Sequence, residues 1–157
     1  MEIRYFTKND FPIYTTWFED DQLNKALGPI DEAWLNYVLA ESPPSQFSCS
    51  IEGTIVAVVG IARPTESNAN YVITDIAVDP ERKRTGLASR ALLSVIEETD
   101  PNASWTAYVE RPNETAFRFF ESLDWIPTIP AEKNEMIQFD RKPPLDRIDQ
   151  QIEQSEK

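Results

Sequence analysis

Apolar and polar positions along the chain recur with two different periods. Short runs rich in β-branched and aromatic residues, bounded by turn residues, predict strands. These runs cover residues 2–6, 47–51, 54–62, 71–78, 105–109, 125–128 and 135–140. Apolar residues spaced three and four apart predict helices between the strands. The helices cover residues 11–20 with a continuation through 22–27, a segment that begins at Asp31, and residues 86–98 and 113–123.

The order of these elements is β-α-α-β-β-β-α-β-α-β-β, with strands both before and after helices. Such an order predicts a mixed α/β (α+β) fold with one sheet flanked by helices. A length of 157 residues suits one domain, which we place at residues 1–142. Residues 143–157 are polar, with Leu145, Ile148 and Ile152 spaced as a weak helical stripe. We expect them to form a tail, either frayed or helical.

Composition narrows the class of protein. Hydrophobic residues make up 41% of the chain, which favours a globular fold. No apolar run approaches the ~20 residues that span a bilayer, and the first residues lack the pattern of a signal peptide. The single cysteine, Cys49, excludes an internal disulfide framework and is expected to be a buried small hydrophobe rather than a nucleophile. We therefore expect a cytoplasmic protein with no membrane partner.

The chain contains no histidine and has a net charge of −12. The lack of histidine excludes a His-based triad and a His-ligated metal, so no metal is expected and proton transfer must use other groups. The acidic balance argues against a nucleic-acid partner, which would require a basic face. It permits a cationic substrate through electrostatic steering, although solubility alone would also explain it.

The segment from Asp79 to Ser89 indicates an anion site. A predicted strand ends, a turn follows, and a helix begins at or near Gly86, one of only four glycines. The first N–H groups of a helix have no partner within it and attract anions. Lys83 and Arg84 add positive charge there. These residues alone leave open whether the turn binds a phosphate or is only a solvated basic turn.

Two motifs make the chain similar to a known family. Residues 73–81 and then 83–88 resemble the strand, Arg/Gln-x-x-Gly-x-Gly/Ala turn and helix of the GNAT superfamily of acyl-CoA-dependent N-acyltransferases. The motif positions are taken by Lys83, Gly86 and Ala88. The family's second signature, Asn-x-x-Ala-x-x-Phe-Tyr, is matched in spacing by Asn113, Ala116, Phe119 and Phe120. The resemblance extends over residues 2–140 and implies the same fold.

The resemblance also implies a site for acetyl-CoA as co-substrate. Backbone groups of Ile76, Ala77 and Val78 would pair with the pantetheine arm as an added strand does. Asn113 would help to hold that arm, and the helix after it would flank the thioester with Ala116, Phe119 and Phe120. The pyrophosphate would be bound by backbone N–H groups of Lys83, Arg84, Thr85, Gly86, Leu87 and Ala88.

For catalysis, the family pattern implies that the Val78 N–H stabilises the oxyanion. It also makes Asp75 a candidate base, with a strand-surface aspartate as the alternative. Phe120 departs from the pattern, because relatives often carry a tyrosine there that can protonate the thiolate. Tyr108 is a substitute candidate, with a packed strand aromatic as the alternative. Asp79 is expected to cap the turn before Pro80.

The implied reaction is direct transfer of an acetyl group to a primary amine of a small molecule or peptide. The acceptor cleft of the family is lined by the first two helices, so we expect a cationic amine near Trp17, Glu19, Asp20, Asp21, Asp31, Glu32 and Trp34. Packing in the core is the alternative for at least two of Trp17, Trp34 and Tyr37. Two other functions stay open, namely a CoA-binding module with weak or lost catalysis and an acidic interaction protein. The sequence also leaves a homodimer open.

Overall fold

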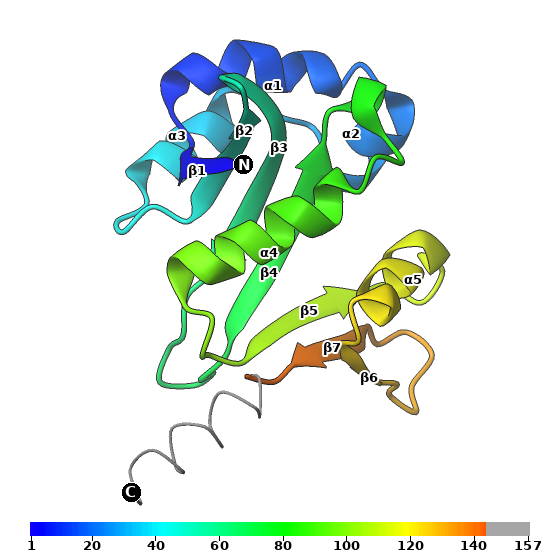
Figure 1. The fold of residues 1–157 in the computed structure, drawn as a ribbon. Helices are drawn as coiled ribbons and strands as arrows, with labels where there is room; N and C mark the ends of the chain where they lie inside the picture. The colour runs from blue at the N-terminus through cyan, green and yellow to red at the C-terminus, as the bar shows by residue number, and fades with distance from the viewer. Residues whose placement is uncertain (144–157) are drawn as a thin grey trace, which may run out of the picture.

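The predicted strands assemble into one seven-stranded sheet in the computed structural model, which describes residues 1–143 (Figure 1). The strands lie in the order β1-β2-β3-β4-β5-β7-β6, and every neighbouring pair is antiparallel except β4 and β5. Their bounds are β1 Glu2–Tyr5, β2 Gln46–Ile51, β3 Thr54–Ala62, β4 Tyr71–Val78, β5 Trp105–Val109, β6 Ile126–Thr128 and β7 Ile137–Arg141. The mixed α/β fold with a single sheet is therefore confirmed.

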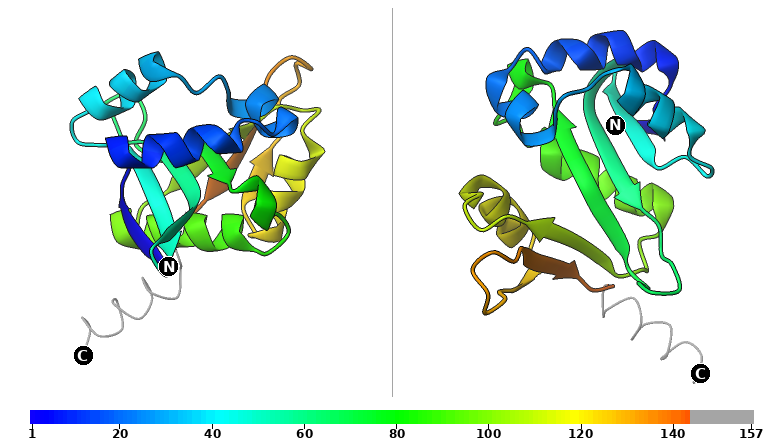
Figure 2. Two further views of the ribbon diagram at one scale, coloured as in Figure 1. Left: turned by 90° about the horizontal axis from the view of Figure 1, so that it is seen from above. Right: turned by 180° about the vertical axis from the view of Figure 1, so that it is seen from behind.

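Helices cover both faces of this sheet (Figure 2). One face carries α1 Phe11–Trp17, α2 Asp21–Leu27 and α3 Glu32–Ala40, and the other carries α4 Leu87–Thr99 and α5 Glu114–Ser122. Two short 3-10 turns, η1 Lys8–Asp10 and η2 Pro80–Arg82, precede α1 and follow β4. None of the helices in residues 1–143 is long and apolar enough to cross a membrane. The tail predicted for residues 143–157 lies, from residue 144 onward, outside the described residues.

The helical stretch that we expected to continue to Leu27 is divided into two helices, α1 and α2. The division falls at Asp20, whose side chain accepts a hydrogen bond from the Leu23 N–H at 3.0 Å and so caps the start of α2. Asp31 caps α3 in the same way, accepting from the Trp34 N–H at 2.9 Å, as the sequence predicts. A carboxylate in this position satisfies N–H groups that the helix itself leaves unpaired.

Two apolar cores follow from the two helix layers. The larger one packs α4, with Ala91 and Leu92 completely buried, against the inner strands and α5. The smaller one packs α1 and α3 against the other face and contains Trp17. Cys49 is fully buried in the larger core, which confirms that it packs there as a small residue, and burial raises its pKa to about 12.

The sheet opens between its two parallel strands. Tyr71–Ile73 of β4 pair with Trp105–Ala107 of β5, and no pairing of these two strands continues beyond that point. The rings of Tyr71 and Trp105 stack at 4.5 Å at the closed end. Beyond Ile73 the two arrows diverge in Figure 1. The edge of β4 that faces β5 is therefore left without a strand partner, and this opening positions the site.

Candidate active site

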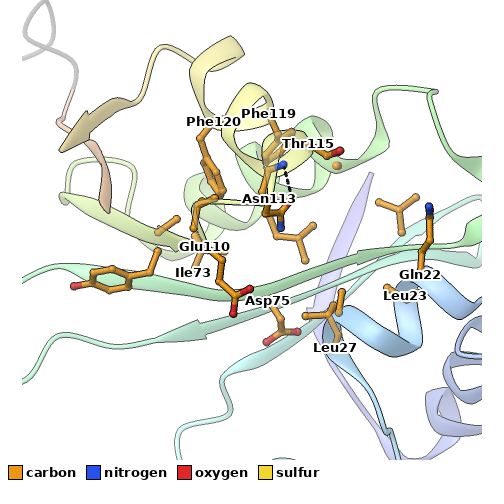
Figure 3. A pocket seen from close by; sticks show the side chains of 18 of the residues that line it. Gln22, Leu23, Leu27, Ile73, Asp75, Glu110, Asn113, Thr115, Phe119 and Phe120 are labelled. Atoms are coloured by element: carbon orange, nitrogen blue, oxygen red, sulfur yellow. Dashed lines mark hydrogen bonds between the residues drawn. The ribbon is translucent and has the colours of Figure 1, made fainter. Parts of the chain in front are cut away.

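A cleft of about 640 Å³ occupies the opening between β4 and β5. Its walls come from α2, β4, the start of α4, β5 and α5, which are far apart in the sequence (Figure 3). All three predicted catalytic residues, Asp75, Val78 and Tyr108, line it. Among the predicted cofactor residues, those that line it are Ile76, Val78, Lys83, Ala88, Asn113, Ala116, Phe119 and Phe120.

The backbone of β4 presents alternate residues to the cleft. The Asp79 N–H donates to the Val56 carbonyl of β3 at 3.0 Å. Backbone groups alternate between the two edges of an antiparallel strand, so those of Ala77 also face β3, and those of Ile76 and Val78 face the opening. Ala77 itself does not line the cleft, and its side chain is buried in the smaller core. The edge that a pantetheine arm could pair with is therefore carried by Ile76 and Val78.

The turn before α4 has two residues in the left-handed backbone region. Arg84 has a φ of +65° and Gly86 a φ of +76°. Apart from Gly86 itself and its two neighbours in the chain, no atom of the described residues lies within 4 Å of where a Cβ on Gly86 would stand, so this glycine is required by its conformation and not by crowding. The first hydrogen bond of α4 runs from the Arg90 N–H to the Gly86 carbonyl. The N–H groups of Leu87, Ala88 and Ser89 are left for an anion.

Two side chains of this turn are already engaged. Lys83 Nζ lies 3.3 Å from Asp20 Oδ2, which ties the turn to the cap of α2. The Thr85 hydroxyl donates to the Arg82 carbonyl at 2.6 Å. Arg84, Thr85, Gly86 and Leu87 flank the cleft without lining it. These two contacts hold the turn in place, and the N–H groups at the start of α4 are left for a ligand. Asp79 accepts from the Glu81 N–H at 3.0 Å and caps η2, as predicted.

The start of α5 closes the cleft on the other side. The Asn113 side chain accepts from the Ala116 N–H at 3.1 Å and caps the helix, which leaves its amide N–H₂ for a ligand. Phe120 is 6% exposed, and its ring packs 5.0 Å from that of Trp125 and 5.5 Å from that of Phe139. The residue in the family's tyrosine position is thus an aromatic of the core that reaches the cleft without a hydroxyl.

Asp75 is held by two hydrogen bonds. Its Oδ2 accepts from Gln46 Nε2 and its Oδ1 from the Thr74 hydroxyl, both at 2.7 Å. Burial raises its pKa, the two hydrogen bonds oppose that shift, and the nearby Glu41 carboxylate adds to it. A carboxylate with a raised pKa is better matched to proton abstraction near neutral pH than an exposed one.

Two residues that sequence reasoning missed, Gln46 and Gly60, build this arrangement. Gly60 lies opposite Asp75 on β3. A Cβ at Gly60 would stand 2.1 Å from Asp75 Oδ1, 2.6 Å from Thr74 Oγ1 and 2.7 Å from Gln46 Oε1. Only glycine leaves room for the three side chains together. A glycine inside an apolar strand often marks such a close approach, and this signal was present in the sequence.

Two further groups face the cleft from β5 and its end. Tyr108 lies in its wall with 47% of its surface exposed, so it is a surface residue of the site and not a packed core aromatic. Glu110, which the sequence did not point to, follows β5. In Figure 3 its side chain and that of Asp75 extend into the same space between α5 and α2. It is a second carboxylate within the cleft.

The acidic lining expected from the first helices is absent from this cleft. Asp20 and Asp31 serve as helix caps, and α2 contributes Gln22, Leu23, Ala26 and Leu27 to the wall. Trp17 is buried and Trp34 packs against the smaller core, while Tyr37 is exposed. Two of these three aromatics therefore have the packing role that the sequence favoured.

A mixed sheet opened between two parallel strands, with free helix N–H groups beside the opening, defines the fold of an N-acetyltransferase. Residues 8–125 match the model of the Acetyltransferase (GNAT) family. The chain belongs to this family. No curated protein matches it in sequence.

Solved structures agree with this fold. The ribosomal-protein-alanine N-acetyltransferase from Brucella melitensis is similar with a TM-score of 0.68 and 16% identity, over 90% of this chain and 99% of that one. Diaminobutyrate acetyltransferase from Paenibacillus lautus, solved with its substrate and coenzyme A, has a TM-score of 0.59 and 15% identity, over 90% of this chain and 94% of that one. A spermidine N-acetyltransferase chimera from Vibrio cholerae and hSSAT has a TM-score of 0.67 and 12% identity, over 91% of this chain and 97% of that one.

Proposed function

We propose that this protein transfers an acetyl group from acetyl-CoA directly to a primary amine. The observation that carries the proposal is the unpaired edge of β4 at Ile76 and Val78, which leads to the free N–H groups at the start of α4. An extended chain with amide groups fits such an edge, and a pyrophosphate fits such a helix start. The similar structures act on a ribosomal-protein alanine, diaminobutyrate and spermidine by their names, and all three are amines.

The proposed mechanism uses groups of the cleft. Acetyl-CoA supplies an activated thioester. Asp75 accepts a proton from the ammonium group, directly or through water, so that a neutral amine can attack. The Val78 N–H donates to the oxygen on which negative charge develops. Phe120 cannot return a proton to the thiolate, and Tyr108 or water takes that role.

The first test is binding of acetyl-CoA, which should raise the melting temperature because it binds the folded state. Gly86→Ala has a matched control in Gly53→Ala. Both glycines have a φ near +80° and open space where an added methyl group would stand, but Gly53 belongs neither to the cleft nor to the turn before α4. We expect similar losses of stability in the two variants and a loss of the acetyl-CoA shift only in Gly86→Ala. No shift in the wild type at millimolar acetyl-CoA would contradict the proposal.

The second test is catalysis, measured as thiol release over a panel of amino acids, polyamines, aminoglycosides and peptide N-termini. Asp75→Asn should lower kcat by about 10²-fold or more, the usual size of a general-base contribution, and leave the acetyl-CoA shift in place. An unchanged pH–rate profile in this variant would remove Asp75 from the base role.

Phe120 favours a second candidate function, a CoA-binding module with weak or lost catalysis. A chain without the family's hydroxyl could bind acetyl-CoA and turn it over slowly or not at all. Binding without thiol release across the whole panel would favour this CoA-binding module over the enzyme.

A further inference from the structure

A second cavity, of about 610 Å³, lies on the α3 side of the sheet. It is bounded by α3, by the loop from Glu41 to Ser45, and by the adjoining parts of β2, β3 and β4, and we refer to it as the α3 pocket. Among the residues that the structure describes, Asp75 alone lines both this pocket and the cleft between β4 and β5. A molecule in the α3 pocket would therefore meet the carboxylate proposed as base from the α3 face of the sheet, and a molecule in the cleft would meet it from the unpaired edge of β4.

The charged groups of the α3 pocket are two carboxylates and one guanidinium. Glu41 and Asp75 are the carboxylates, and Glu41 accepts a hydrogen bond from the Ser45 hydroxyl. Neither carboxylate has an ion-pair partner within residues 1–143. The two acids act on each other electrostatically, since the charge of Glu41 raises the pKa of Asp75. An ammonium group placed between them would relieve this repulsion.

Arg63 is the guanidinium. Its Nη2 donates to the Pro44 carbonyl at 2.8 Å, its Nε is buried without a hydrogen-bond partner, and it forms no ion pair within the described part of the chain. A guanidinium fixed to a backbone carbonyl, with no carboxylate of its own, is suited to the anionic group of a ligand.

The spacing of these groups defines a ligand with two ends. Asp75 lies opposite Gly60 on β3. Arg63 follows Gly60 by three residues, directly after the end of β3. Three residues of extended chain span roughly 10 Å. The wall between the ends includes the rings of Trp34 and Tyr37, the latter 70% exposed. A short carbon chain can pass along these rings with an amine at one end and an anion at the other.

We propose that the α3 pocket binds the acetyl acceptor and that this acceptor is a small amine that also carries a carboxylate, of the amino acid or diamino acid class. The amine lies at Asp75 and Glu41 and the carboxylate at Arg63. The proposal rests on the function proposed above. In the reaction a bond forms between the amine nitrogen and the acetyl carbon, and the carbon–sulfur bond breaks. The ammonium loses two protons in total, of which one ends on the CoA sulfur and one in solvent.

The test compares acceptors that differ only in the carboxylate. The pairs are lysine and cadaverine, ornithine and putrescine, and 2,4-diaminobutyrate and 1,3-diaminopropane. We expect kcat/KM to be about tenfold or more higher for the carboxylated member of at least one pair, mainly through KM, because one hydrogen-bonded charge pair is worth that much. The preference should disappear in Arg63→Gln, weaken in Arg63→Lys, and persist in Arg118→Gln, which removes an exposed arginine of α5 that lies outside the pocket.

The outcomes separate this inference from the function on which it rests. Equal or faster turnover of the diamines by the wild type, or a preference that survives in Arg63→Gln, would overturn the acceptor class while leaving an acetyltransferase. An absence of thiol release with every amine, together with an acetyl-CoA melting shift, would overturn both the acceptor class and the enzymatic function. The wild-type comparison needs no variant, so a poorly folding Arg63→Gln does not affect it.

Discussion

Replacement of Gly60 by alanine tests how the proposed base is held. The added methyl group would stand 2.1 Å from Asp75 Oδ1 and 2.7 Å from Gln46 Oε1, both far inside van der Waals contact. Gly60 is buried in the middle of the sheet, so its backbone cannot move away cheaply. The carboxylate must therefore leave its position, and the 2.7 Å bond from Gln46 Nε2 is the contact that breaks with it.

The magnitudes follow from these contacts. Overpacking of this kind costs about 1–3 kcal/mol of stability, which for a chain of this size lowers Tm by about 3–10 °C. A hydrogen bond to a charged group is worth about 1.5–3 kcal/mol. The bond from Gln46 opposes the raised pKa of Asp75, so its loss should raise that pKa further. The acid limb of the kcat/KM profile should then move to higher pH, because Asp75 stays protonated, and inactive as a base, over a wider range.

The assay is thiol release as a function of pH, with thermal unfolding measured on the same samples. Gln46→Leu removes the hydrogen bond without adding a methyl group at Gly60, and it should move the profile in the same direction. Gly28→Ala is the steric control, because its Cβ would meet Asn24 Oδ1 at the same 2.1 Å but would touch no group of the Asp75 network. It should lower Tm and leave the pH profile in place. A Gly60→Ala enzyme with a wild-type profile would refute the reasoning.

Three further predictions concern other residues. Arg84→Gly should be about 1 kcal/mol more stable in urea unfolding than Arg84→Ala, since both lose the charge but only glycine relieves the left-handed φ of +65°; equal stabilities would contradict the strain. Burial tends to raise the pKa of Asp10, but hydrogen bonds from Arg4, Thr7 and Ser48 outweigh it and lower the pKa to about 2. The carboxylate therefore contributes about 2 kcal/mol of stability above pH 5, which is lost as the pH falls towards 2; Asp10→Asn should flatten this part of the stability–pH curve. Phe120→Tyr should raise kcat by about tenfold if protonation of the thiolate limits turnover, a modest share of what general acids contribute; an unchanged kcat would show that the missing hydroxyl is not limiting.

The sequence predicted three strands to the residue, at 54–62, 71–78 and 105–109. Each is a run of β-branched and aromatic residues between turn residues. This pattern lies within the segment itself, so it can be recognised without knowledge of tertiary contacts. The division of α1 from α2 was missed, although Asp20 is a typical N-cap residue, because the apolar spacing alone continues through it. The family motifs predicted part of the cleft lining, but not Glu110 or the residues of α2. The α3 pocket was not predicted, because Glu41, Arg63 and Asp75 come together only by tertiary contact.

The bulge in β4 explains why one strand can serve both cavities. Ile73 pairs with Ile61 and Asp75 with Gly60, so Thr74 is an extra residue against β3. In a regular strand Ile73 and Asp75 would share a face. The extra residue shifts the alternation, so that Ile73, Ile76 and Val78 pack towards α4 while Asp75 and Ala77 turn towards the layer of α1 to α3.

This shift gives β4 two separate uses. Its edge at Ile76 and Val78 faces the opening, where an acetyl donor would lie, and its Asp75 side chain faces the α3 pocket, where an amine would lie. Without the extra residue, Asp75 could turn towards α3 only if Ile73, which would then share its face, left the larger core. Gly60 completes the arrangement, since the carboxylate turned by the bulge needs the space that a side chain on β3 would fill. The bulge and Gly60 therefore act together to place the Asp75 carboxylate. A change in either should lower turnover of the acceptor more than it weakens binding of acetyl-CoA.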